Sequence, residues 1–179
     1  VLVPDKNAGC SLADSCPADE FAKFIQQHPD HIVVSYVNTT AAVKTLTDIV
    51  VTSTNARKII DQLPKDAKII FAPDRNFGNY LNNVTGRNMV LWNGGCHVHE
   101  QFSVEKLIEL KRQYPTAKVL AHPECTTSVL QLADVIGSTH ALLNYTQHNT
   151  ATEFLIATET GILHEMQKHS PQKRLLIVP

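Results

Sequence analysis

Short runs of β-branched and other apolar residues alternate with amphipathic stretches along the whole chain. In the first part this pattern predicts strands at 1–3, 31–36, 48–51 and 68–71, and helices after Pro17, at 40–46 and at 54–63. Behind Pro17, a residue favoured at the first helical position, Phe21, Phe24 and Ile25 recur at helical spacing. Strands that alternate with helices in this way are typical of small parallel sheets covered by helices on both faces.

The same pattern continues in the second part of the chain. It predicts strands at 89–92, 118–121, 134–136 and 153–157, a helix capped by Ser103, and a helix at 126–132. The final residues, Arg-Leu-Leu-Ile-Val-Pro, resemble the start of another strand. In an open sheet of parallel strands, ligands bind at the carboxyl ends of the strands.

The two parts are related by a repeat of 86 residues. Cys10 follows Asn-Ala-Gly and Cys96 follows Asn-Gly-Gly, and these cysteines lie 86 positions apart. At the same offset the chain pairs Gly9 with Gly95, Pro29 with Pro115, Val33 with Val119, Thr40 with Thr126, Val43 with Val129, Leu46 with Leu132 and Asp48 with Asp134. Identities in this order indicate a duplicated structural unit. Two α/β domains with a site between them are therefore expected.

Composition limits the classes of protein that fit. The chain has 43% hydrophobic and 18% charged residues, enough apolar residues for a real core, and a net charge of −1. With a pI of about 6.8 there is no basic excess for nucleic acid. No apolar run approaches the roughly 18 residues that span a bilayer, and no basic stretch leads into a secretory signal. We therefore expect a cytoplasmic protein without a membrane or nucleic-acid partner, whose four cysteines are not disulfide-bonded.

Polar side chains follow equivalent predicted strands in the two copies. The strand at 31–36 leads to Tyr36 and Asn38, and its counterpart leads to His122 and Glu124 at the same offset. Tyrosine also packs well in strands, so Tyr36 alone is weak evidence. Four groups that can bind a ligand or move a proton, at matching strand ends, nevertheless favour a functional site over core filling.

Hydroxyl residues stand where the next helices are expected to begin. They are Thr52-Ser53-Thr54 in the first copy and Gly137-Ser138-Thr139 in the second. Ser and Thr are ordinary helix caps, and most capped helices bind nothing. Their recurrence beside the polar strand ends, together with the positive helix N-terminus, favours an anionic ligand that carries carboxylate or phosphate.

The cysteines and histidines allow two kinds of metal site. A single cysteine is more often a core residue than a ligand, and we expect Cys16 and Cys125, which lack a repeat partner, to be structural. Cys10 and Cys96 each follow a glycine-rich turn and fit an inorganic cluster held at a domain junction better than a zinc module. The alternative is a mononuclear metal site on His97 and His99, which follow a predicted strand at positions i and i+2 and are expected to share one face.

These motifs resemble the quinolinate synthase family, the iron–sulfur enzymes of de novo NAD biosynthesis. The matching segments occur in family order and span nearly the whole chain: 9–14 (GCSLAD), 36–41 (YVNTTA), 52–56 (TSTNA), 72–78 (APDRNFG), 92–96 (WNGGC), 122–125 (HPEC), 133–139 (ADVIGST) and 157–161 (ATETG). The resemblance implies three α/β/α domains around a pseudo-threefold axis, of which this chain holds two. They are 1–86, the middle domain of the family, and 87–172, followed by 173–179 as the start of a return into the missing domain.

The resemblance also implies a reaction and its residues. Members condense iminoaspartate with dihydroxyacetone phosphate to quinolinate, using a [4Fe–4S] cluster as a Lewis acid, and have a functional link to L-aspartate oxidase. Cys10 and Cys96 would be cluster ligands, and the third cysteine is expected shortly beyond Pro179. Glu124, His122 and Tyr36 would be catalytic. The substrate-binding set would be Tyr36, Asn38, Ser53, His122, Glu124, Ser138 and Thr139.

The chain alone is expected to be inactive. The alternatives are a mononuclear metal-dependent hydrolase using His97 and His99, and a non-catalytic anion-binding α/β module.

Overall fold

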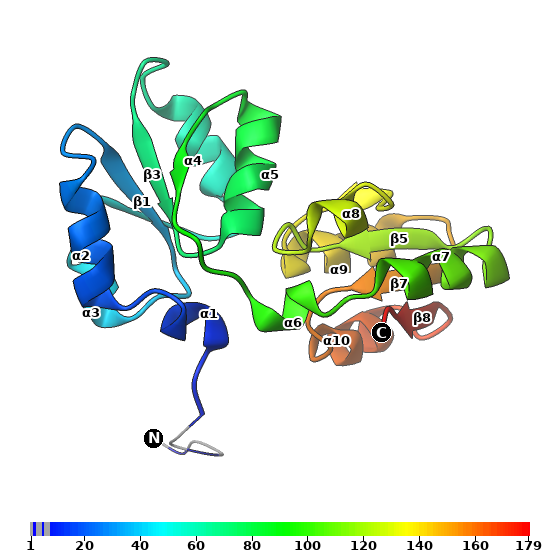
Figure 1. The fold of residues 1–179 in the computed structure, drawn as a ribbon. Helices are drawn as coiled ribbons and strands as arrows, with labels where there is room; N and C mark the ends of the chain where they lie inside the picture. The colour runs from blue at the N-terminus through cyan, green and yellow to red at the C-terminus, as the bar shows by residue number, and fades with distance from the viewer. Residues whose placement is uncertain (1, 3–4, 6–7) are drawn as a thin grey trace. The chain divides into compact units, whose positions relative to one another are not determined.

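The computed structural model describes Leu2, Asp5 and residues 8–179, so the strand predicted at 1–3 lies outside the described residues apart from Leu2. The chain forms two compact units, residues 1–52 with 58–96, and residues 53–57 with 97–179. Each unit is built on one four-stranded sheet in which all strand pairs are parallel (Figure 1). The predicted α/β fold with small parallel sheets is thus confirmed.

The first unit has the strand order β2-β1-β3-β4. Its elements are α1 (Ser11–Asp14), α2 (Ala18–Gln26), β1 (Ile32–Tyr36), α3 (Ala41–Lys44), β2 (Ile49–Val51), α4 (Ala56–Gln62), β3 (Ile69–Ala72), α5 (Arg75–Thr85) and β4 (Val90–Leu91). The first two residues of α4 group with the second unit. β4, which opens the second copy of the sequence repeat, completes the first sheet by pairing with β3.

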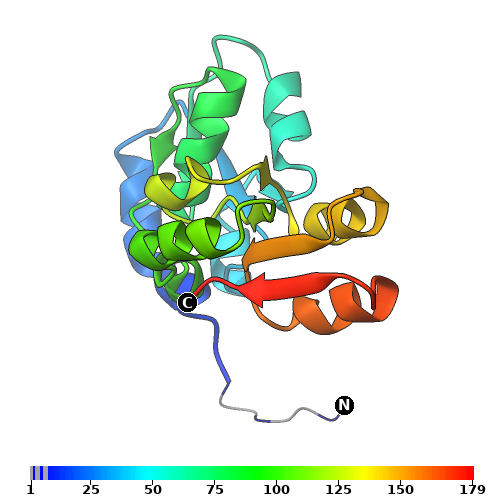
Figure 2. The same ribbon diagram turned by 90° about the vertical axis from the view of Figure 1, so that its right-hand side faces the viewer.

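The second unit has the strand order β6-β5-β7-β8. Its elements are α6 (His97–Glu100), α7 (Val104–Gln113), β5 (Lys118–Ala121), α8 (Thr127–Leu130), β6 (Val135–Ile136), α9 (Thr139–His148), β7 (Glu153–Ala157), α10 (Ile162–His169) and β8 (Arg174–Ile177). Figure 2 shows β8 in red beside β7 in orange. The strand predicted at the end of the chain is therefore present.

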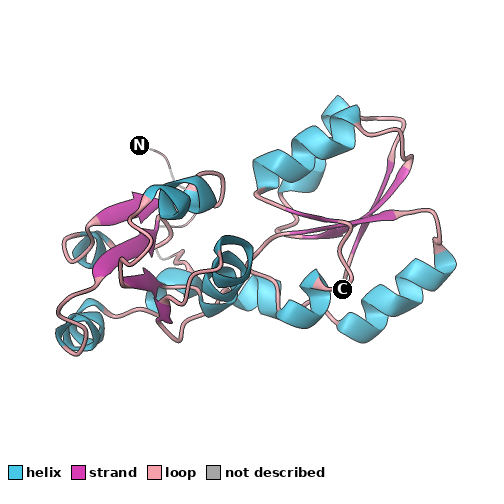
Figure 3. Cartoon of the chain, turned by 90° about the horizontal axis from the view of Figure 1, so that it is seen from above, coloured by secondary structure: helices cyan, strands magenta, loops and turns pink. Residues whose placement is uncertain are grey.

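Strict alternation along the strands produces the three layers of the second unit. Val119 and Ala121 of β5 belong to an apolar cluster with Leu107 of α7 and Val129 of α8. Leu120, the residue between them, belongs to a second cluster with Leu142 of α9 and Met166 of α10. Because successive side chains of a strand point to opposite faces, the sheet is covered by helices on both sides, as Figure 3 shows.

The first unit uses the same principle. One core cluster gathers Phe21 of α2, Val33 of β1, Val43 of α3 and Ile70 of β3. Phe71, the neighbour of Ile70, points to the other face and meets Phe77 of α5 edge-on, with ring centroids 5.4 Å apart. The helices predicted after Pro17, at 40–46 and at 54–63 are all present with slightly shorter bounds.

Helix α5 is absent from the sequence prediction, and so is α10. The sequence of α5 contains four asparagines and Gly78, all of which have low helix propensity. Its ends are nevertheless well defined, because Asp74 accepts a hydrogen bond from the Phe77 N–H at 2.7 Å and Gly86 adopts a left-handed φ of 67°. Gly78 allows α5 to lie against Leu91, since a Cβ there would come within 2.6 Å of the leucine side chain.

The sequence repeat is reproduced in hydrogen bonds. Asp48 accepts from the N–H of Val33 at 2.8 Å, and Asp134 accepts from the N–H of Val119 at 2.8 Å, 86 residues later in both partners. The boundaries 1–86 and 87–172 describe this repeat in the sequence and stay a prediction. No helix among the described residues combines the length and the apolar composition that crossing a bilayer requires.

Candidate functional site

The carboxyl end of β5 carries the polar pair predicted from the sequence. The His122 N–H donates to the Ala157 carbonyl at 3.0 Å, which extends the β5–β7 ladder by one residue. A turn then closes with the Cys125 N–H donating to the His122 carbonyl at 3.0 Å. The side chains of His122 and Glu124 are therefore held at the sheet edge, and both residues are almost completely buried, with 3% and 2% exposure.

His99 of α6 and Thr158, which follows β7, complete this cluster. His99 Nδ1 lies 2.9 Å from Glu124 Oε2, and His99 Nε2 lies 3.2 Å from Thr158 Oγ1. The imidazoles of His99 and His122 stack, with centroids 4.8 Å apart and planes inclined by 29°. We call His99, His122, Glu124 and Thr158 the β5 cluster. Three segments that are distant in sequence thus place a carboxylate, two imidazoles and a hydroxyl together.

A hydrogen bond indicates the tautomer of His122, and burial determines its protonation state. Its Nδ1 accepts from the Glu124 N–H at 3.3 Å, so the proton of the neutral ring is on Nε2. Burial lowers the pKa of His122 to about 4, the Glu124 carboxylate opposes this shift, and His99 adds to it. His122 is therefore neutral near pH 7 and offers a hydrogen-bond donor at Nε2, while Glu124 offers a carboxylate that His99 holds in place.

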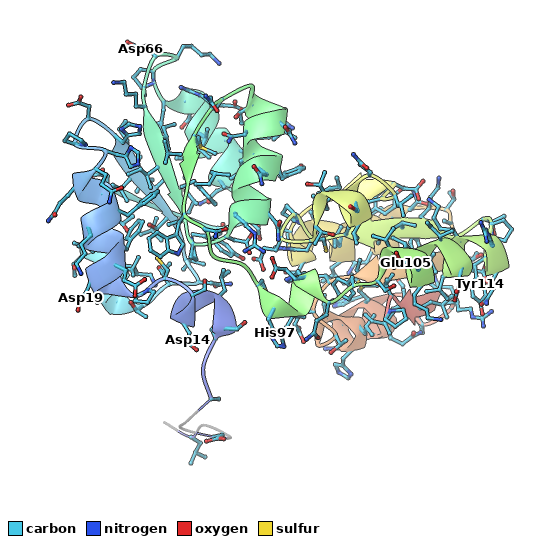
Figure 4. The ribbon with its side chains drawn as sticks, in the orientation of Figure 1. Asp14, Asp19, Asp66, His97, Glu105 and Tyr114 are labelled. Atoms are coloured by element: carbon cyan, nitrogen blue, oxygen red, sulfur yellow. The ribbon has the colours of Figure 1, made fainter. Side chains whose placement is uncertain are left out.

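The alternative site on His97 and His99 loses its geometric basis. Residues 97–100 form a one-turn helix rather than an extended segment, so these two side chains leave α6 in different directions. His97 is exposed, whereas His99 is 6% exposed (Figure 4 labels His97 on α6). The expectation that both histidines share one face is therefore wrong.

The predicted hydroxyl residues stand at a helix start. Ser138 is the N-cap of α9, since its Oγ accepts from the Ala141 N–H at 3.2 Å, and Thr139 is the first helical residue. Thr54, whose segment groups with the second unit, donates its hydroxyl to Ser138 Oγ at 3.1 Å. Ser53 precedes Thr54 in the turn before α4 and is half-buried. Ser138 and Thr54 thus form a pair of hydroxyl groups at the start of α9.

Tyr36 and Asn38 lie at the carboxyl end of β1 in the first unit. Tyr36 is the last residue of the strand and is buried, with its ring 5.4 Å from that of Phe77. Asn38, two residues later, is exposed. The side chain of Thr39 donates to the Tyr36 carbonyl at 3.2 Å, which fixes the turn between them. Both residues occupy the sheet edge at which parallel α/β folds bind ligands.

The four cysteines separate into two classes. Cys16 and Cys125 are fully buried. Burial, and then the nearby Glu20 carboxylate, raise the pKa of Cys16 to about 12. The Cys125 thiol donates to the Ala157 carbonyl at 3.3 Å. Cys10 is exposed and Cys96 is half-buried, and each directly precedes a one-turn helix, α1 or α6. Only this second pair is both accessible and equivalent in the repeat, which suits a metal-ligating role.

Comparison with known proteins identifies the family of the chain. The family model described as "Quinolinate synthetase A protein" matches residues 1–179. The chain belongs to this family. Curated quinolinate synthases from Synechocystis sp., Thermosynechococcus vestitus and Gloeothece citriformis are 59%, 58% and 56% identical over all 179 residues. The chain spans only 55–56% of the length of these relatives.

Two residues of the β5 cluster, His99 and Thr158, are not among the site residues predicted from the sequence. The sequence presents His99 only as a pair with His97, because nothing in Cys-His-Val-His-Glu distinguishes the two histidines until the helical turn is known. Thr158 lies within a matching family segment, but a hydroxyl after a strand carries no chemical signal by itself. The repeat does not reveal either residue, since Ala13 and Ala72 stand opposite His99 and Thr158.

Proposed function

We propose that this chain supplies two of the three domains of a cytoplasmic quinolinate synthase, which condenses iminoaspartate with dihydroxyacetone phosphate. The family match over all 179 residues supports this proposal above all. The substrates are anionic, and the hydroxyl groups of Ser53, Ser138 and Thr139 suit their carboxylates and phosphate. Iminoaspartate would come from an L-aspartate oxidase, the functional partner.

Cys10 and Cys96 would hold a [4Fe–4S] cluster together with a cysteine beyond Pro179. Their accessibility, in contrast to the burial of Cys16 and Cys125, fits thiolate ligation. Three protein thiolates leave one iron of the cluster able to act as a Lewis acid toward a substrate oxygen. The remaining chemistry would fall to side chains of the protein.

The β5 cluster is suited to the proton transfers that ring closure requires. His122 is neutral and donates from Nε2, so it can hold a substrate oxygen without adding charge. Glu124 would accept and return protons, because its carboxylate is buried and oriented by the 2.9 Å contact with His99. Tyr36 and Asn38 would bind the condensing substrates from the end of β1.

The proposal is tested on the full-length protein purified without oxygen. We expect about four irons per chain, as for a cubane cluster, and quinolinate formation from the two substrates. Cys10→Ser and Cys96→Ser should abolish cluster assembly, whereas Cys16→Ser should not. Glu124→Gln should retain the cluster and lower kcat roughly 10²- to 10⁴-fold. A colourless protein that holds one zinc, or equal behaviour of the three cysteine variants, would contradict the proposal.

The chain itself, residues 1–179, provides a second test. Without the third cysteine it should neither retain a stable cluster nor form quinolinate. Quinolinate formation by this chain alone would contradict the proposed division of the site among three domains.

A further inference from the structure

Cys10 and Cys96 are the two accessible cysteines of the first unit. The segments that carry them are joined by a hydrogen bond from the Trp92 indole. The Trp92 Nε1–H donates to the Ser15 carbonyl at 2.8 Å. Ser15 ends α1, the one-turn helix that begins directly after Cys10, and Trp92 precedes Cys96 by four residues. This bond therefore joins the Cys10 helix to the segment that leads to Cys96.

The indole is itself fixed by its neighbours. The ring of Trp92 meets those of Phe21 and Phe24 edge-on, with centroids 5.6 Å and 5.4 Å away. Both phenylalanines belong to α2, whose packing against β1 and β3 forms the core of the unit. Because packing against the core holds the Trp92 indole in place, its hydrogen bond to Ser15 fixes the position of α1.

Gly94 lets the two segments approach closely. A Cβ at this position would lie 2.5 Å from the Pro73 carbonyl oxygen and would also collide with the Ser15 hydroxyl. The Gly94 carbonyl accepts from the Arg75 N–H at 2.9 Å. The chain between Trp92 and Cys96 is thus held against the start of α5 on one side and the end of α1 on the other.

Asp74 fixes the backbone of Cys96. Its carboxylate is fully buried, and Oδ1 accepts from the Phe77 N–H at 2.7 Å, which caps α5. Oδ2 accepts from the Cys96 N–H at 3.0 Å. A helix cap needs only one oxygen, and Asn and Ser cap as well as Asp does. The second oxygen distinguishes Asp74 from Asn or Ser at this position, because it accepts a charge-assisted hydrogen bond from the Cys96 backbone.

We propose that Asp74 and Trp92 are positioning residues that hold Cys96 and the Cys10 helix in one arrangement before the cluster binds. This inference rests on the cluster ligation proposed above. Ligands that are already ordered lose less conformational entropy when they bind, so binding is tighter. Partners that orient metal ligands commonly affect metal affinity 10- to 100-fold. Neither Asp74 nor Trp92 is itself a ligand.

The decisive experiment compares cluster retention among variants of the full-length protein. Each is reconstituted anaerobically with iron and sulfide, and the loss of visible absorption is followed after addition of an iron chelator. Asp74→Asn keeps an oxygen for the α5 cap but places an amide nitrogen opposite the Cys96 N–H. Trp92→Phe keeps the aromatic packing and removes only the donor. Both variants should lose the cluster roughly 10-fold faster or more.

Asp48→Asn is the matched control, because Asp48 also binds a backbone N–H in the same unit, that of Val33. It should retain the cluster as the unmodified protein does. If Asp74→Asn and Trp92→Phe also retain it unchanged, or if Asp48→Asn loses it equally fast, the inference is overturned. An unmodified protein that takes up no iron would instead contradict the proposed function.

A second measurement needs no cluster. In the apo protein, a short bifunctional thiol reagent should cross-link Cys10 to Cys96, detected by peptide mapping, and the yield should fall several-fold in Trp92→Phe. Equal yields in Trp92→Phe and in the unmodified protein would overturn the positioning role even if the cluster were never formed.

Discussion

Arg87 and Lys173 stand 86 residues apart, and each binds the carbonyls at the C-terminal end of an equivalent helix, α4 or α9. The Arg87 Nη2 acceptors are Ile60 at 3.0 Å and Leu63 at 2.6 Å, and the Lys173 Nζ acceptors are Thr146 and, at 2.6 Å, Asn149. Both pairs of acceptors are also 86 residues apart. The repeat therefore preserves a helix-capping interaction even where the residue types differ.

Removal of the Lys173 cation should destabilise the second unit. Lys173→Met leaves two helix-terminal carbonyls without their donor and removes a positive charge from the negative end of α9. We expect a loss of about 1–3 kcal/mol in the free energy of unfolding, measured in urea. Lys106→Met is the control, since Lys106 forms an exposed ion pair with Glu109, and should cost about 0.5 kcal/mol or less. Equal losses in both variants would show that the carbonyl contacts contribute nothing.

The strands could be predicted because their cause is local. The short, mostly apolar runs at 118–121 and 153–157 coincide with β5 and β7. Helix α5 could not be predicted because its residues have low helix propensity. The helix is stabilised instead by tertiary contacts, the cap at Asp74 and the packing of Gly78 against Leu91. The assignment of β4 to the first sheet is likewise a matter of pairing with β3, which no property of Val90 and Leu91 reveals.

The part of the candidate site that depends only on strand topology could be predicted from the sequence. His122 and Glu124 follow a strand, so their place at the sheet edge comes from topology alone. The contact of His99 with Glu124 depends on the rotation of a one-turn helix, which separates a buried His99 from an exposed His97. Such a rotation is set by packing and not by the alternation of residues.

The stability of the folded chain should depend on His122 in acid. The pKa of His122 is about 4 in the folded chain against 6.5 for the free side chain. As pH falls from 6.5 towards 4, the unfolded chain takes up a proton that the folded chain refuses, so stability falls in this window. Above it His122 contributes no pH dependence. The slope from this group is at most about 1.4 kcal/mol per pH unit. The free energy of unfolding of His122→Asn, measured in urea at several pH values, should therefore depend less on pH between 4 and 6.5 than that of the unmodified protein. An unchanged dependence on pH in this window would contradict the lowered pKa of His122.

Thiol labelling should separate the cysteines by accessibility. In the native apo chain, an alkylating reagent at pH 8 should modify Cys10 rapidly, because Cys10 is exposed. Cys16 should stay unmodified until the chain unfolds, since it is buried and its pKa of about 12 keeps it a thiol. Peptide mapping with and without urea measures both. Rapid native labelling of Cys16 would contradict the buried position of this residue.

The hydroxyl of Thr158 should matter for catalysis through His99. In the neutral tautomer whose Nδ1–H donates to Glu124, His99 Nε2 is the acceptor and Thr158 Oγ1 is the donor at 3.2 Å. Thr158→Val is nearly the same size but removes this donor, so His99 can adopt the other tautomer and release Glu124. In the full-length protein we expect kcat to fall roughly 10-fold or more with little change in KM, because a misplaced proton carrier slows the chemical step rather than binding.

Thr158→Ser, which keeps the hydroxyl, should restore most of the rate. Thr116→Val is the control, since Thr116 meets Glu153 only at an exposed position, and should leave kcat unchanged. If Thr158→Val and Thr158→Ser behave alike, the hydroxyl does not orient His99.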